Sequence, residues 1–194
     1  LASLSLAEIQ LELLKVLPGT RMRAEAASAG VRYAPDSPYE VLATDAITPD
    51  GLQTARKLSR ILDLFYNSAV FRHVTIGLSA SSPTFFADLL TYPEAPEVLE
   101  KPLSLEHRGR LLYAYCERFA SSFCYDVTVA WLKAGLSVHK EPGGAVEVWR
   151  GELPPDADHS PAVKWYRLAS AAKCLYIGYD RSRQMNIPLY LIEV

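Results

Sequence analysis

The side chains in this sequence that most often do chemistry are histidines and cysteines, and their spacing does not assemble a site. None of the four histidines lies three or four residues from another histidine or from a cysteine, the spacing that brings two metal ligands together on one helix face. They are His73, His107, His139 and His159. We therefore predict no metal site in this chain.

The cysteines, Cys116, Cys124 and Cys174, are odd in number and irregular in spacing. This pattern favours the reducing cytoplasm over a disulfide framework. Cys116 and Cys124 lie in apolar helical contexts, and we interpret them as buried small hydrophobic residues.

Motifs for nucleophilic catalysis and phosphate binding are missing as well. The sequence contains no G-x-S-x-G elbow, no phosphate-binding loop and no G-x-G-x-x-G. Asp63 and Asp126 are candidate buried acids, although a solvated flank or a helix amino terminus accounts for each of them. A weaker hypothesis is a small hydrolase that uses Asp126, His139 and scattered tyrosines. We predict no catalytic residue.

Composition and charge narrow the class of protein. The chain has 194 residues, of which 49% are hydrophobic and 22% charged, and its net charge is −2. A chain of this length can bury about 70% of its extended surface, which is enough for one core. No basic block suggests nucleic acid, and no apolar run approaches the roughly 20 residues that span a bilayer. We expect a cytoplasmic, mainly helical domain with no nucleic-acid or membrane partner.

The strongest helix signal covers residues 48–71. Thr48 can accept a hydrogen bond from a first-turn amide, Pro49 suits the first helical position, and Asp50 complements the helix dipole. Asn67 is the expected stop, because it tolerates a left-handed turn. The buried stripe recurs at steps of three and four residues and consists of Leu52, Ala55, Leu58, Leu62, Phe65 and Ala69.

The remaining pattern predicts mainly α structure with a small β component, the α+β class. Further helices are expected over residues 20–30, from Pro83 with Ser82 as its cap, over 104–119 and over about 121–134; residues 91–102 form a linker. Beyond residue 136, residues 146–149 suggest a strand, 162–172 a short helix or turn, and 174–179 with 187–194 an antiparallel strand pair. Residues 21–136 would form a bundle-like helical domain and 137–194 a small β-containing appendage.

Residues 1–20 allow two interpretations. Ser5 to Glu8 resemble a capping box that opens a short helix, whereas the partial alternation of residues 9–17 suggests a strand. Pro18 and Gly19 end either element. The chain starts at Leu1, so we expect it to be a piece of a longer protein.

Three segments carry a family resemblance. They are LELLKVLPGTRMRAEA, then GVRYAPDSPYEVLATDAIT, then LSRILDLFYNSAVF with its D-x-x-Y-N-S string. The later runs GRLLYAYCERF and CLYIGYDRS are similar in style. In this order they resemble the carboxy-terminal part of radical S-adenosylmethionine proteins that carry an amino-terminal cobalamin-binding domain. In that family the LKVLPGT strand closes a partial (β/α) barrel, and a helical domain follows it.

The resemblance implies that residues 1–20 are the end of such a barrel, with a leftover barrel strand. Barrel sites lie at the carboxyl ends of strands, so Lys15, Leu17, Pro18, Gly19 and Thr20 would lie near the cofactor or substrate in the intact parent. The alternative is that Pro18 and Gly19 merely turn the chain.

The family binds its iron–sulfur cluster through C-x₃-C-x₂-C, a spacing that this chain lacks. The cluster, S-adenosylmethionine and any cobalamin would therefore belong to the upstream barrel domain, the expected partner. The chain would be a non-catalytic domain, inactive alone, that covers the barrel or recognises an unknown substrate or a carrier protein. The alternative is a free-standing helical interaction module.

Overall fold

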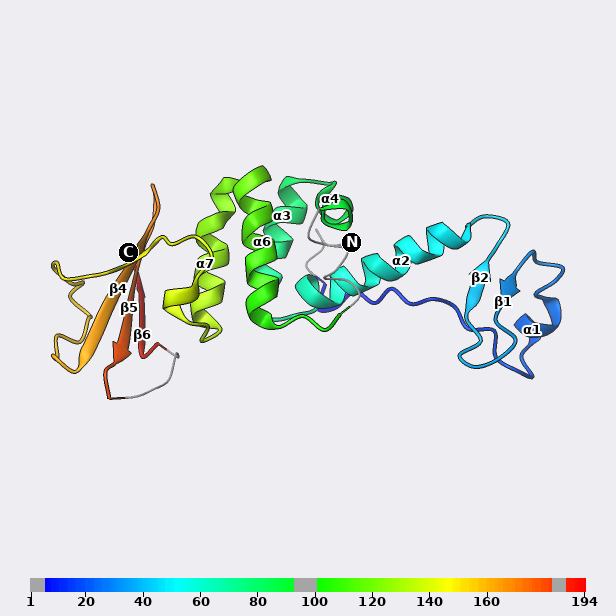
Figure 1. Ribbon diagram of the computed structural model, residues 1–194, viewed down its shortest axis with the longest axis horizontal. Coiled ribbons are helices and arrows are strands. Elements are labelled where there is room, and N and C mark those ends of the chain that lie inside the picture. The colour runs from blue at the N-terminus through cyan, green and yellow to red at the C-terminus, as the bar shows by residue number, and fades with distance from the viewer. Residues whose placement is uncertain (1–5, 93–100, 183–187) are drawn as a thin grey trace.

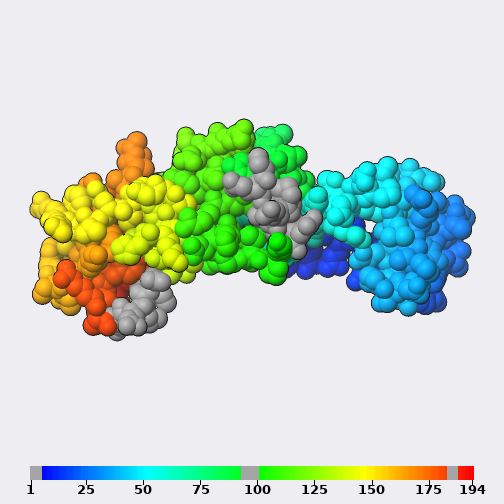
Figure 2. All heavy atoms as spheres, in the orientation of Figure 1, coloured from blue at the N-terminus to red at the C-terminus, as the bar shows by residue number. Residues whose placement is uncertain are grey.

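Helices and sheets follow one another along a single long axis in the computed structural model, which describes residues 6–92, 101–182 and 188–194 (Figure 1). An amino-terminal lobe leads through a long helix to a helical bundle, and a sheet lies at the far end. The colour order along the space-filling view shows the same sequence of parts (Figure 2). The α+β class is confirmed.

The amino-terminal lobe contains α1 (Arg21–Glu25) and the antiparallel strands β1 (Arg32–Tyr33) and β2 (Val41–Ala43). Its small core consists of Val16, Ala26 and Val41. Thr20 caps α1 by accepting a hydrogen bond from the Arg23 amide. The prediction of a helix up to Gly30 was wrong, because turns replace the helix after Glu25, and Gly30 then adopts a positive φ of 63°.

The long helix α2 (Pro49–Ile61) begins as its sequence predicts. Thr48 accepts a hydrogen bond from the Gly51 amide, and Pro49 is the first helical residue. The helix then continues as the π-helix η2 (Leu62–Tyr66), which the sequence did not predict. Asn67 follows with a right-handed φ of −76°, so the stop is confirmed but the expected left-handed conformation was wrong.

The bundle consists of η2, α3 (Arg72–Ser81), α4 (Phe85–Thr91), α6 (Leu105–Phe119) and α7 (Cys124–Lys133). Ser104 caps α6, as predicted. The prediction that Ser82 caps a helix from Pro83 was wrong: α4 starts at Phe85, after Thr84. The linker predicted over 91–102 lies largely outside the described residues. The bundle core includes Phe65, Phe71, Leu78, Phe85, Leu112 and Tyr115.

The carboxy-terminal sheet has the order β3 (Val146–Val148), β4 (Val163–Ala169), β5 (Cys174–Asp180), β6 (Tyr190–Glu193), and all its neighbours are antiparallel. The predicted carboxy-terminal strand pair is confirmed as β5 and β6. The prediction of a helix or turn over 162–172 was wrong, because β4 pairs along its whole length with β5. One face of the sheet packs on α7, where Trp131 and Leu132 contact Tyr166, Leu168, Leu175 and Ile177.

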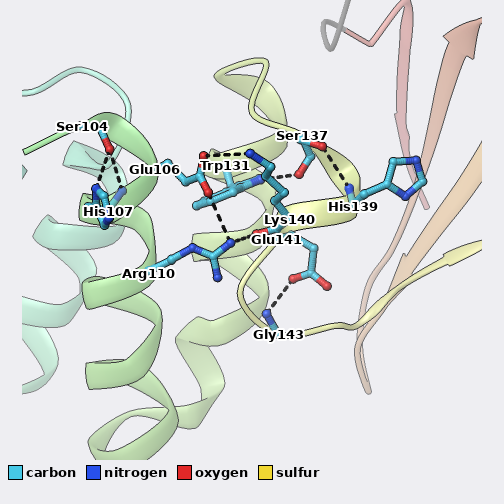
Figure 3. Close-up of polar contacts among 10 residues, drawn as sticks. All are labelled: Ser104, Glu106, His107, Arg110, Trp131, Ser137, His139, Lys140, Glu141 and Gly143. Carbon is cyan, nitrogen blue, oxygen red and sulfur yellow. Dashed lines mark hydrogen bonds and ion pairs between the residues drawn. The ribbon is translucent and has the colours of Figure 1, made fainter.

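Polar contacts also join the bundle to residues 137–143, the connection between α7 and β3 (Figure 3). Arg110 on α6 donates a hydrogen bond to the Lys140 carbonyl at 2.5 Å, and the indole N–H of Trp131 donates to the Ser137 carbonyl at 3.0 Å. The buried Glu141 carboxylate accepts from the backbone amides two and five residues further on, at 2.8 and 3.3 Å. The connection between α7 and β3 is therefore fixed to the helices by hydrogen bonds as well as by apolar packing.

Candidate functional site

The leading segment, residues 6–17, contains neither the predicted helix nor a full strand. It runs beside α2 from the bundle to the amino-terminal lobe (Figure 1). The Ser5 to Glu8 capping box falls partly outside the described residues, and residues 6–20 contain no helix. In place of the predicted strand over residues 9–17, the structure has a single antiparallel bridge, between Lys15 and Glu40.

Side chains at the end of η2 and the start of α3 bind the backbone of this segment. The side-chain amide oxygen of Asn67 accepts a hydrogen bond from the Ile9 N–H at 3.0 Å, and its nitrogen donates one to the Ile9 carbonyl at 2.9 Å. The Tyr66 hydroxyl and the Arg72 guanidinium both donate to the Leu6 carbonyl, at 2.8 and 2.9 Å. We call Tyr66, Asn67 and Arg72 the clamp. It contacts main-chain atoms, so it fixes the path of the segment without selecting its side chains.

The π-helix positions the clamp. The backbone N–H of Asn67 donates to the Leu62 carbonyl at 2.7 Å. This is an i to i−5 bond, which accommodates one residue more than an α-turn does. The Asp63 carboxylate accepts from the Asn67 side-chain nitrogen at 2.9 Å and so orients the amide. The Arg72 guanidinium stacks 5.1 Å above the ring of the buried Tyr66. These contacts do not involve the segment, so the clamp is preorganised.

Further along, the segment pairs with the amino-terminal lobe through one edge only. The Val16 N–H donates to the Tyr39 carbonyl at 2.7 Å, and the Val41 N–H donates to the Leu14 carbonyl at 2.9 Å. In an antiparallel ladder the N–H and C=O of the residue between such bonds point to the opposite edge. Those two groups of Lys15 make no hydrogen bond within the part of the chain that the structure describes. We call this the free edge.

Apolar side chains accompany the free edge. Val16 is buried in the core of the lobe, but Leu11, Leu14 and Leu17 are 36%, 54% and 48% exposed. Between residues 20 and 50, the large apolar side chains with similar exposure are Met22, Leu42 and Ile47. An extended segment with an unpaired edge and outward leucines resembles an unfinished sheet edge, which proteins normally cover or blunt with charge.

The predicted site residues lie at this end of the segment. Lys15 lines a shallow cavity of about 300 Å³ together with Glu40 and Arg56, which form an ion pair. Residues 17–20 form the turn into α1, in which Gly19 has a φ of 76° and Thr20 donates to the Leu17 carbonyl at 2.7 Å. The turn alone accounts for their local structure. Their role near a cofactor stays a prediction.

The other candidate chemical groups lie apart. Burial raises the pKa of the Cys116 thiol to about 12, and burial also raises that of Cys124. The Nε2 atom of His139 is hydrogen-bonded to the Tyr166 hydroxyl at 3.2 Å, whereas Asp126 lines a cavity beside α3. No hydrogen bond or ion pair of the described residues joins Asp126 to His139, so the hydrolase hypothesis has no geometric support. No three potential metal ligands come together in the described ranges.

Sequence reasoning missed the clamp. It treated Asn67 as a helix stop and assigned no role to Tyr66 or Arg72. The signal was present in the D-x-x-Y-N-S string, which contains Asp63, Tyr66 and Asn67, but the π-helix that lets them meet the leading segment has no such signature.

The fold and the clamp define an α+β domain in which a helical bundle holds an extended leading segment and supports a carboxy-terminal sheet. The chain belongs to the family described as "Protein of unknown function (DUF4080)", whose model matches residues 28–133. The match begins after α1, covers β1, β2 and the bundle through α7, and stops before the sheet; the leading segment lies outside it. No curated protein and no solved structure matched the chain. No helix of the described ranges is long and apolar enough to cross a membrane.

Proposed function

We propose that this chain is the carboxy-terminal domain of a radical S-adenosylmethionine enzyme of the cobalamin-binding type. In this proposal the domain is non-catalytic and inactive alone, and it covers the barrel or recognises the substrate or a carrier protein. The order of the LKVLPGT, P-Y-E-V-L and D-x-x-Y-N-S segments supports the assignment.

The observation that carries the proposal is the free edge at Lys15, with Leu11, Leu14 and Leu17 exposed beside it. A strand within a barrel has a hydrogen-bonded neighbour at each edge. Among the described residues the leading segment pairs with one neighbour, and an upstream strand of the same chain would supply the other. The upstream barrel domain is therefore the proposed partner, and the leucines would be covered by it.

The cofactors of such an enzyme would be held upstream. A cluster needs thiolates that can approach one iron–sulfur unit, and the cysteines of this chain do not fit that need. Cys116 is fully buried in the bundle core with a pKa raised to about 12, while Cys174 lies on β5 of the sheet. Lys15, Leu17, Pro18, Gly19 and Thr20 would approach S-adenosylmethionine or the substrate only in the intact parent.

Two measurements test the assignment. The coding sequence upstream of Leu1 should contain C-x₃-C-x₂-C, whereas a start codon next to Leu1 would contradict the proposal. The isolated chain, treated anaerobically with iron and sulfide, should incorporate no stoichiometric cluster; stoichiometric incorporation would show that a cluster site lies in this chain.

The docking surface can be tested with the upstream part supplied as a separate polypeptide. Leu14→Glu places a charge among the exposed leucines and should weaken the association at least tenfold. Leu189→Glu is the matched control, because Leu189 is 45% exposed but lies in the sheet lobe. Equal affinities for the two variants would contradict docking through the leading segment.

A free-standing interaction module is the alternative, and the clamp favours it, because backbone-directed hydrogen bonds can hold any extended peptide. A start codon next to Leu1, together with clamp-dependent capture of an added extended peptide by a chain that lacks residues 1–17, would support this alternative.

A further inference from the structure

A second cavity, independent of the leading segment and of the proposed function, lies between α3 and α7 near the end of the sheet. Its volume is about 470 Å³, within the range of small-molecule sites. Small and β-branched side chains form its apolar floor: Val70, Val74, Val129 and Ala130. Tyr125, Ala69 and Ala134 also line the wall, and the small size of the two alanines leaves the space open.

Charged groups surround this apolar floor. Asp126, Val129, Ala130 and Lys133 recur at steps of three and four residues, so they share one face of α7. Lys173 and Glu193 close the sheet side as an ion pair at 3.8 Å.

The groups on the helices are unpaired. Neither Asp126 nor Lys133, nor His73 on α3, makes a hydrogen bond or ion pair with another described residue through its side chain. An acid in the first turn and a base in the last turn also suit the dipole of α7. The dipole does not account for the open apolar cavity between them.

The spacing of Asp126 and Lys133 along α7 guides the choice of ligand length. Asp126 and Lys133 are seven residues apart, which corresponds to about 10 Å along the helix at its rise of about 1.5 Å per residue. An extended peptide gains about 3.3–3.6 Å per residue, so the termini of a dipeptide or tripeptide lie about 7–10 Å apart. We propose that this cavity binds a short zwitterionic peptide, with its ammonium group at Asp126, its carboxylate at Lys133 and an apolar side chain on the floor.

The test uses calorimetric titration of the whole chain with the tripeptide Ala-Leu-Ala. The free tripeptide should bind about tenfold more tightly than its N-acetylated or its carboxyl-amidated form, because each capped form loses one charge-assisted contact. Asp126→Asn should abolish the preference over the N-acetylated form only, and Lys133→Gln the preference over the amidated form only.

Matched controls separate binding from helix stability. Asp50→Asn and Arg60→Gln remove a first-turn acid and a last-turn base from α2, outside the cavity, and should leave peptide affinity unchanged. Ala69→Trp, at an exposed position in the cavity wall, should block binding without changing the circular dichroism spectrum. Equal affinity for free and capped peptides, no binding of any of them, or unchanged binding by Ala69→Trp would overturn the proposal.

Discussion

Replacing Asn67 with alanine should loosen the leading segment while leaving the bundle folded. The substitution removes the two hydrogen bonds between the Asn67 amide and the Ile9 backbone, at 3.0 and 2.9 Å. Each such bond contributes a net 0.5–1.5 kcal/mol, and Asn67 is only half-buried, so we expect a loss of about 1–2 kcal/mol in the local docking free energy. That loss corresponds to an about five- to thirty-fold rise in local opening.

Native-state amide hydrogen exchange measures this opening directly, because the Ile9 N–H is itself one of the donors. In Asn67→Ala, the Ile9 amide should exchange about five- to thirty-fold faster, while the amides of α6 keep their protection. The Val16 amide, bound to the Tyr39 carbonyl, is the internal reference for the lobe. Gln53→Ala, at an exposed position of α2, should change nothing. An unchanged Ile9 rate, or an equal loss of protection in α6, would refute the clamp as the device that holds the segment.

Three further outcomes follow from packing and burial. Gly109→Ala should destabilise the chain by about 1–2 kcal/mol in urea unfolding, despite alanine's better helix propensity, because its Cβ would lie 2.6 Å from Trp131. Tyr179→Phe removes a buried hydroxyl that has no hydrogen-bond partner among the described residues, and it should be neutral or stabilise by up to about 1 kcal/mol. Tyr115→Phe loses a hydrogen bond to the Asp88 carboxylate and should cost about 1 kcal/mol. Burial raises the pKa of both tyrosines from 10.0 to about 12, so between these pH values the folded state binds more protons than the unfolded state and stability falls as pH rises. Urea titrations at pH 9, 10 and 11 should show that fall, and it should be shallower in Tyr179→Phe.

The helices were predictable where local signals decide the structure. Thr48, Pro49 and Asp50 mark the start of α2, and Ser104 marks that of α6, because side-chain caps act within one turn. The end of α2 was not predictable in detail. The buried residues Leu64, Phe65 and Tyr66 are consecutive, which is wider than the single apolar stripe that a 3.6-residue period predicts, so the pattern did not indicate the π-helix.

The error at β4 has a different cause. The sequence VKWYRLA lacks clean alternation, because the strand is covered on both faces: by α7 on one side and by Trp149, Leu153 and Ala157 on the other. A segment buried on both sides and flanked by polar turns cannot be distinguished from a short helix by periodicity alone. Its partners lie on β3 and β5, and that information is not local.

The candidate site was predictable only in part. The segment that contains Lys15 to Thr20 was singled out from its sequence, but its attachment was not, because hydrogen bonds from Tyr66, Asn67 and Arg72 join residues about sixty positions apart. Backbone carbonyls as acceptors leave no trace in the side chains of the segment, so no pattern within residues 6–9 could reveal the contact.

The extra residue in η2 affects everything that follows it. One residue corresponds to about 100° of rotation around a helix axis, so a straight α-helix over the same stretch would turn the Asn67 amide away from the leading segment. A single-codon deletion between Leu62 and Tyr66 could thus preserve every clamp residue and still uncouple the two ends of the domain. Among relatives, the length of this helix, more than the identity of its last residues, would then mark those that share the same attachment.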